Sequence, residues 1–187
     1  MTARRSRSAA APALPEGLEE AVVLALFDLA NHVARRGERL AGVAGLTTQQ
    51  WLVLLQVAHD PNFPSAGGAS DAPVLASDIA RARGVSRATI STIVSALKRR
   101  GLIREEVGAD DARRRHLEVT EAGAAAIEAI QPARQAANQR LLGALPAADR
   151  ARFLRYLRGC LDVLWEARED EQVAVAQRKL AGKRARP

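Results

Sequence analysis

The sequence predicts a mainly α-helical protein with one small β-hairpin. Apolar residues recur at helical spacing through most of the 187 residues, a glycine separates two short helical patterns near residue 84, and two alternating segments flank a turn after residue 101. With 48% hydrophobic and 26% charged residues, the composition is that of a globular protein. We therefore expect one compact domain, or little more than one.

The composition excludes several classes of protein. The single cysteine rules out internal disulfides and cysteine-rich zinc sites, and three scattered histidines leave little material for a metal cluster. No apolar run approaches the roughly 18 residues of a membrane-spanning helix. The net charge of +7 and the pI near 10.8 favour a polyanionic partner, either nucleic acid or an acidic membrane surface. We expect a cytoplasmic protein with no metal ion, no cofactor and no membrane span.

The N-terminal half begins with a basic tail and continues with apolar helices. We expect residues 1–17 to be a disordered basic tail. In residues 18–45, apolar positions recur every three or four residues over a broad stripe, and such a helix needs a large partner surface. The segment 47–55 starts with a threonine cap and becomes almost fully apolar, as the centre of a fold would. Residues 60–73 are dense in Pro, Gly, Ser and Asp, which predicts a loop.

Two short helical patterns that meet at Gly84 predict a helix-turn-helix. Gly84 can adopt the left-handed conformation that ends the first helix, and Ser86 stands where the cap of the second helix belongs. Helical projection gives the second helix an outward face of small, hydroxyl-bearing and arginine side chains, which can approach base edges in the major groove. The alternative is an ordinary solvated face, on which glutamate or lysine would be more usual. The candidate DNA-binding residues of this helix are Ser86, Arg87, Ala88, Thr89, Ser91, Thr92, Ser95 and Arg99.

The alternating segments of residues 102–119 predict a hairpin beside this motif, with Arg113, Arg114 and Arg115 at its tip. A basic hairpin in this place is typical of a wing, whose arginines can enter the minor groove. The alternative is a solvated turn, although three adjacent like charges repel each other when no anion is near. Residues 74–119 carry ten Lys and Arg against six Asp and Glu, so DNA binding should weaken steeply with salt.

Residues 120–172 return to helical spacing, with Pro146 suited to the first turn of a last helix. Pro132 predicts a kink within the preceding helix. Together with residues 18–45, these helices are too apolar for a small winged-helix core to bury, so we expect them to form the interface of a homodimer. Cys160 lies on the apolar stripe, which favours a small buried residue over a peroxide sensor. Residues 173–187 are expected to be a basic tail.

The chain resembles the MarR family of transcriptional regulators over roughly residues 18–168. The motifs that carry the resemblance are Leu46-Thr47-Thr48-Gln49-Gln50-Trp51, Gly84-Val85-Ser86-Arg87-Ala88-Thr89-Ile90, Leu97-Lys98-Arg99-Arg100-Gly101-Leu102-Ile103, the pair Asp111 and Arg113, and Leu117-Glu118-Val119-Thr120-Glu121-Ala122-Gly123. The loop 60–73 is longer than is usual in the family, and Leu75 stands where a Ser or Thr cap is frequent.

The resemblance implies a winged helix-turn-helix over residues 46–119, flanked by terminal dimerisation helices. It also implies that Arg113 reaches the minor groove, buttressed by Asp111, a contact that a bidentate carboxylate pair would support. Family members often bind small aromatic effectors, for which His32 and Trp51 are candidate contacts. The interpretation that both simply pack in the fold, or lie at a helix edge, is favoured.

These observations predict a homodimeric, sequence-specific DNA-binding transcriptional regulator, most simply a repressor released by a small effector. Its partner would be double-stranded DNA with a pseudo-palindromic operator, because the two recognition helices of a dimer lie about one DNA turn, roughly 34 Å, apart. The alternatives are a non-specific architectural DNA-binding protein and a winged helix used only for protein contacts. No nucleophile elbow, Walker loop or dinucleotide fingerprint is present, so we expect no catalytic residues and no enzyme activity.

Overall fold

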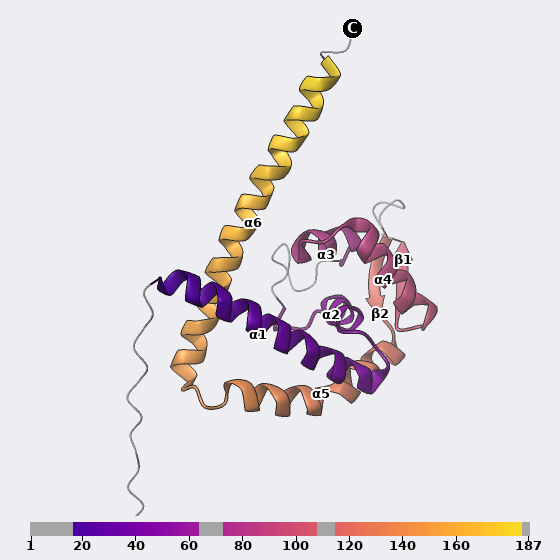
Figure 1. The fold of residues 1–187 in the computed structure, drawn as a ribbon. Coiled ribbons are helices and arrows are strands. Elements are labelled where there is room, and N and C mark those ends of the chain that lie inside the picture. The colour runs from indigo at the N-terminus through magenta and orange to yellow at the C-terminus, as the bar shows by residue number, and fades with distance from the viewer. Residues whose placement is uncertain (1–16, 64–72, 108–114, 185–187) are drawn as a thin grey trace, which may run out of the picture.

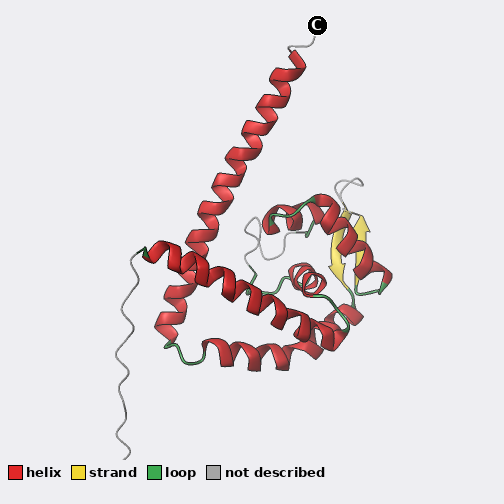
Figure 2. Ribbon diagram, viewed as in Figure 1, coloured by secondary structure: helices red, strands yellow, loops and turns green. Residues whose placement is uncertain are grey.

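The structure is a computed structural model that describes residues 17–63, 73–107 and 115–184, with side chains described as far as residue 167. It confirms the mainly helical fold with one small antiparallel sheet (Figure 2). Most of the expected tail at 1–17, most of the loop 60–73 and the wing tip lie outside these residues. The elements are α1 (Leu18–Ala41), the 3-10 turn η1 (Gly42–Ala44), α2 (Thr48–Val57), α3 (Ala76–Arg83), α4 (Arg87–Arg99), β1 (Ile103–Val107), β2 (Arg115–Val119), α5 (Glu121–Leu142) and α6 (Ala147–Arg184).

Helix α2 lies at the centre of the fold (Figure 1). Helices α3 and α4 and the hairpin lie on one side of it, and the long helices α1, α5 and α6 lie on the other. A capping box starts α2: the Thr47 hydroxyl accepts a hydrogen bond from the Gln50 backbone amide, and the Gln50 side chain accepts one from the Thr47 amide. The nearly continuous apolar run that follows is buried on almost every side, as predicted.

The core joins the helix-turn-helix to the first half of α5. Its members from α2 include Leu54 and Leu55, and those from α4 and α5 include Ile90 and Ile130, all with at most 2% of their surface exposed. Because Ile130 belongs to the same cluster, α5 starts as part of the winged helix before it leads away toward α6. The expected boundary at residue 120 therefore does not separate two cores.

The helix-turn-helix forms as the residue pattern predicts. Gly84 ends α3 with φ of 65°, a left-handed conformation that glycine adopts at little cost. The Ser86 hydroxyl accepts a hydrogen bond from the Thr89 backbone amide at 3.1 Å and so caps α4. At the other end of α3, the helix begins after Leu75 without a side-chain cap.

The wing is anchored at its base by three neighbouring contacts. Strands β1 and β2 pair antiparallel from Ile103↔Val119 to Val107↔Arg115, and Val74 forms an isolated bridge to Leu117 at the outer side of β2. Thr120 caps α5 through the Gly123 amide and donates its hydroxyl hydrogen to the Gly101 carbonyl. A side chain at position 123 would overlap the carbonyl oxygen of Leu102, so only glycine fits at this position.

The terminal helices expose large apolar side chains in the single chain. Phe27 of α1 is 65% exposed, and Leu164 of α6 is 64% exposed. Cys160 is also exposed, so the prediction that it is buried is wrong for the single chain, because α6 has no neighbour over that face. Helix α6 continues to Arg184 rather than giving way to a tail at residue 173, and α5 runs through Pro132 as one helix.

No single helix in the described part of the chain is both long enough and apolar enough to span a membrane. Taken together, residues 18–44 and α2 pass that test by length and composition alone, with a bend of 72° between them.

Candidate nucleic-acid interface

All eight residues predicted to face DNA on α4 have exposed side chains in the structure. The opposite face of the helix is buried through Ile90, Val94 and Leu97, so the helix presents its polar side outward. Several hydroxyls on that side already have partners. The Ser86 and Thr89 hydroxyls lie 2.8 Å apart, and Thr92 donates to the Ala88 carbonyl at 3.1 Å. These bonds restrict the hydroxyl rotamers before any base is met.

Arg100 holds the C-terminal end of α4, a role that the sequence pattern does not reveal. Its guanidinium donates to the Gly45 carbonyl at 2.6 Å and to the Ala44 carbonyl at 2.9 Å. Those carbonyls belong to the turn between α1 and α2, so the C-terminal end of α4 is tied to the segment that follows α1. Arg100, one of the ten basic residues counted within 74–119, is therefore engaged by carbonyl groups of the protein itself.

The strands of the wing carry charges that pair with one another. Glu105 of β1 lies 2.7 Å from the Lys98 ammonium and 3.4 Å from the Arg115 guanidinium. Its hydrogen bond with Lys98 lowers the pKa of the Glu105 carboxyl, so this residue is ionised at neutral pH. Arg104 contacts Glu106 at 2.7 Å and Glu118 at 2.6 Å, and the hydrogen bond with Glu106 raises the pKa of its guanidinium.

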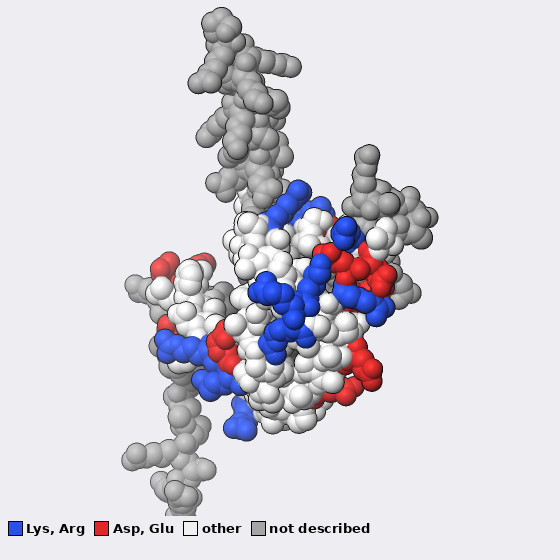
Figure 3. All heavy atoms as spheres, turned by 90° about the vertical axis from the view of Figure 1, so that its right-hand side faces the viewer, with Lys and Arg blue, Asp and Glu red and all other residues white. Residues whose placement is uncertain are grey.

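These ion pairs change the prediction for Arg115. It is exposed, as a wing contact must be, but it shares a carboxylate with Lys98 instead of standing free. Asp111, Arg113 and Arg114 lie outside the described residues. Viewed toward the winged-helix side, Lys and Arg side chains run down the middle of the surface with a group of Asp and Glu beside them (Figure 3). This face therefore carries a basic band bordered by acidic groups.

The two candidate effector residues have different environments. Trp51 is buried in α2, and its indole Nε1 has no hydrogen-bond acceptor among the described residues, whereas His32 is exposed on α1. The Arg134 guanidinium of α5 lies 5.9 Å from the centre of the Trp51 ring. Arg134 was not singled out from the sequence, since a single arginine on a helix carries no recognisable signal.

Comparison with known proteins shows what this part of the chain is similar to. Residues 44–114, which span the centre of the fold, the helix-turn-helix and most of the wing, match the model of the MarR family. This stretch of the chain is therefore similar to the MarR family. The match includes α2, α3 and α4 and ends within the hairpin, so it covers the elements that position the outward face of α4.

The HTH-type transcriptional repressor NicR of Pseudomonas putida is 33% identical to this chain over 90 residues. That match spans 48% of this chain and 57% of NicR, so the chain covers little more than half of its relative's length. By its name, NicR is a transcriptional repressor.

Solved MarR-family structures share the fold beyond the matched segment. The S. aureus MepR structure, a complex with DNA, superposes with a TM-score of 0.60 at 23% identity, covering 74% of this chain and 94% of that one. The structure of CouR from Rhodococcus jostii RHA1, bound to p-coumaroyl-CoA, gives 0.63 at 18% identity, covering 81% and 96%. At these identities the likeness shows the winged-helix fold alone.

Proposed function

We propose that this chain is a homodimeric transcriptional regulator that binds a specific pseudo-palindromic DNA operator and acts as a cytoplasmic repressor. The observation that carries the proposal is the outward face of α4. Its exposed residues are hydroxyl-bearing, small or arginine, and none of the eight is acidic. Such a surface fits the floor of the major groove, where hydroxyls and guanidinium groups meet base edges. The repressor name of NicR supports the direction of regulation.

The exposed apolar faces of α1 and α6 support the homodimer. Leu24 and Phe27 on α1 are 55% and 65% exposed, and Val163 and Leu164 on α6 are each 64% exposed. Apolar surface of this extent on two long helices is typical of an interface between subunits. Two copies joined in this way would present two recognition helices to one face of a duplex.

The first test is selection of bound sequences from a random duplex pool, followed by affinity measurement on the selected and on scrambled duplexes at fixed salt. The proposal expects a twofold-symmetric motif and a specific-to-random affinity ratio of at least about 10³. A ratio near one would favour the architectural alternative. An absence of binding to any duplex at low salt would favour a winged helix used for protein contacts.

The second test addresses the dimer. Phe27→Asp places a charge on the exposed apolar face of α1 and should convert a dimer to a monomer in sedimentation velocity at micromolar concentration. Phe27→Leu keeps the surface apolar and serves as the matched control. A wild-type protein that sediments as a monomer would contradict the dimer.

We also propose that an aromatic small molecule binds near Trp51 and releases the DNA. The buried Trp51 ring beneath the Arg134 guanidinium, with an unpartnered indole N–H, supports a ligand that carries an aromatic ring and an acceptor group. The p-coumaroyl-CoA in CouR is of this chemistry. Titration with p-coumarate should release the selected duplex and alter Trp51 emission, whereas cyclohexane carboxylate should do neither. Release by both compounds, or by neither, would contradict this part.

A further inference from the structure

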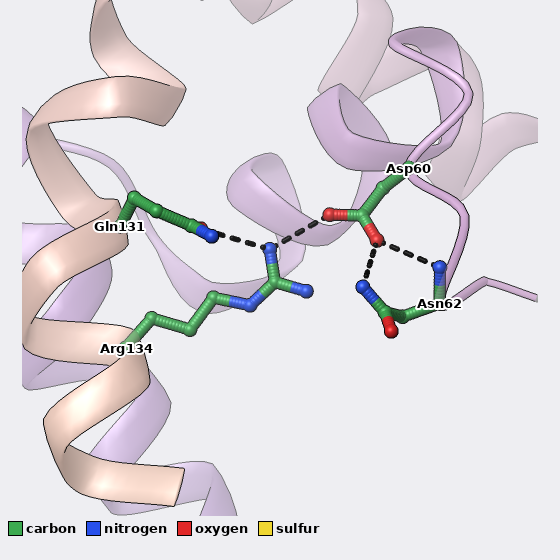
Figure 4. A network of polar contacts seen from close by, with 4 residues as sticks. All are labelled: Asp60, Asn62, Gln131 and Arg134. Atoms are coloured by element: carbon green, nitrogen blue, oxygen red, sulfur yellow. Dashed lines mark hydrogen bonds and ion pairs between the residues drawn. The ribbon is translucent and has the colours of Figure 1, made fainter.

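A nearly buried ion pair joins the end of α2 to the middle of α5. The Arg134 Nη1 lies 2.7 Å from the Asp60 Oδ2, and the two side chains are only 15% and 11% exposed. The other oxygen of Asp60 accepts hydrogen bonds from the backbone and side-chain nitrogens of Asn62 at 2.9 and 2.8 Å. Arg134 also lies 3.4 Å from the Gln131 side-chain oxygen, and it reaches out of α5 toward Asp60 (Figure 4).

The position of this pair on α5 is significant because of Pro132. Proline has no backbone N–H, so the carbonyl of Glu128 loses its helical hydrogen-bond partner. The helix therefore bends more easily at this turn. Ile130, before the proline, is fully buried in the winged-helix core. Arg134, just after it, is held by Asp60. The winged helix therefore contacts α5 both before and after Pro132.

We propose that Arg134 and Asp60 form a latch that fixes the direction of α5 beyond Pro132 and thereby sets the position of the winged helix relative to the terminal helices. The first half of α5 moves with the winged helix because Ile130 is in its core. The second half leads to the proposed dimer helices and is tied to α1, where Arg36 donates to the Ala137 carbonyl at 2.9 Å. Without the latch, the direct connection between the two halves is the helical turn at Pro132, which lacks one backbone hydrogen bond.

The latch rests on the proposed function only in its consequence for DNA. In a dimer, the angle at Pro132 decides the separation of the two recognition helices, and so the half-site spacing that fits. Asp60 and Arg134 are thus positioning residues, which act through α5 and not through contact with DNA.

The decisive measurement is an intramolecular distance that needs no DNA. Spin labels at Arg81→Cys on α3 and Arg140→Cys on α5, in a Cys160→Ser full-length chain diluted with unlabelled chains, report the angle between the winged helix and the second half of α5. The latch predicts one narrow distance distribution, which becomes at least twice as broad in Asp60→Asn and in Arg134→Gln. Unchanged widths in both variants, with the fold intact by circular dichroism, overturn the latch.

A suppressor variant separates positioning from simple stability. Pro132→Ala restores the missing backbone hydrogen bond, so Arg134→Gln combined with Pro132→Ala should return the narrow distribution even though the ion pair is still absent. A purely stabilising pair would not be rescued in this way, and failure of the rescue overturns the proposal. Asp149→Asn removes the exposed pair with Arg152 on α6 and is the matched control, which should leave the width unchanged.

The same variants test the consequence for DNA. On duplexes whose half-site spacing differs by single base pairs, the wild-type protein should prefer one spacing at least tenfold, and the latch variants should reduce this preference to threefold or less. If the wild-type protein binds no duplex, the proposed function fails while the distance measurement still decides the latch. If the preference stays tenfold in the latch variants, the latch does not set the spacing.

Discussion

The Glu105 carboxylate lies 2.7 Å from the Lys98 ammonium, and so joins the last turn of the recognition helix to the first strand of the wing. Glu105 also contacts Arg115, which makes it a counter-charge for two cations near the proposed DNA surface. We expect Glu105→Gln to release both cations for phosphates. Affinity for random duplex should rise, and the slope of log K against log salt should become steeper by about one to two units. Glu121→Gln, an exposed change at the start of α5, is the control, and an unchanged slope for Glu105→Gln would contradict the prediction.

Ser91 is exposed on the outward face of α4, where a carboxylate would meet phosphates and base edges. Ser91→Glu should weaken operator binding by at least tenfold, because a negative charge placed against the polyanionic duplex is repelled. Unfolding free energy should change by no more than about 0.5 kcal/mol, since the position is solvent-exposed. Ala125→Glu introduces the same charge at an exposed position of α5 and should leave binding unchanged. Equal losses in both variants would argue against a DNA-facing α4.

Gly123 lies where α5 passes the carbonyl of Leu102, with no space for a side chain. Gly123→Ala should destabilise the fold by about 1–3 kcal/mol, since the backbone must shift to relieve the overlap. Urea unfolding monitored by circular dichroism measures this loss. Ala124→Gly, at the next position of the helix, should cost only about 1 kcal/mol. A Gly123→Ala variant as stable as the wild type would mean that α5 can move away from the wing freely.

The Asp60 carboxyl has its pKa lowered chiefly by the hydrogen bond from Arg134, against the opposing effect of partial burial. A carboxyl with a lowered folded-state pKa contributes stability above its unfolded pKa of about 3.9, and this contribution is lost as the pH falls through the folded value. Asp60→Asn should therefore cost about 3 kcal/mol at pH 7, because it leaves the nearly buried Arg134 without a counter-charge. The difference from wild type should shrink steadily below about pH 4. A difference that does not depend on pH would show that the charge of Asp60 does not stabilise the fold.

Local pattern was sufficient to predict the elements that the site depends on. The capped apolar run of α2, the glycine between α3 and α4 and the alternation of the wing strands are set by neighbours in the sequence, and all appear in the structure. The outward face of α4 followed from helical projection for the same reason. Dimerisation and the groove contacts themselves stay predictions.

Contacts between residues far apart in the sequence could not be predicted from the local sequence pattern. Asp60 and Arg134 are 74 residues apart, and only the packing of α2 against α5 brings them together. The internal bonds of Arg100 and the shared carboxylate of Glu105 likewise depend on tertiary structure, so counting charges overstated the number of free cations. Cys160 was predicted to be buried because an apolar stripe was assumed to be covered, and in the single chain it is not.

The bridge from Val74 to Leu117 attaches the entry of α3 to the same strand that carries the wing. Strand β2 thereby bonds on one side to β1 of the hairpin and on the other side to the residues that lead into α3. Helix α4 and the hairpin are therefore expected to move together, so a tilt of this unit would weaken both of the proposed groove contacts at the same time.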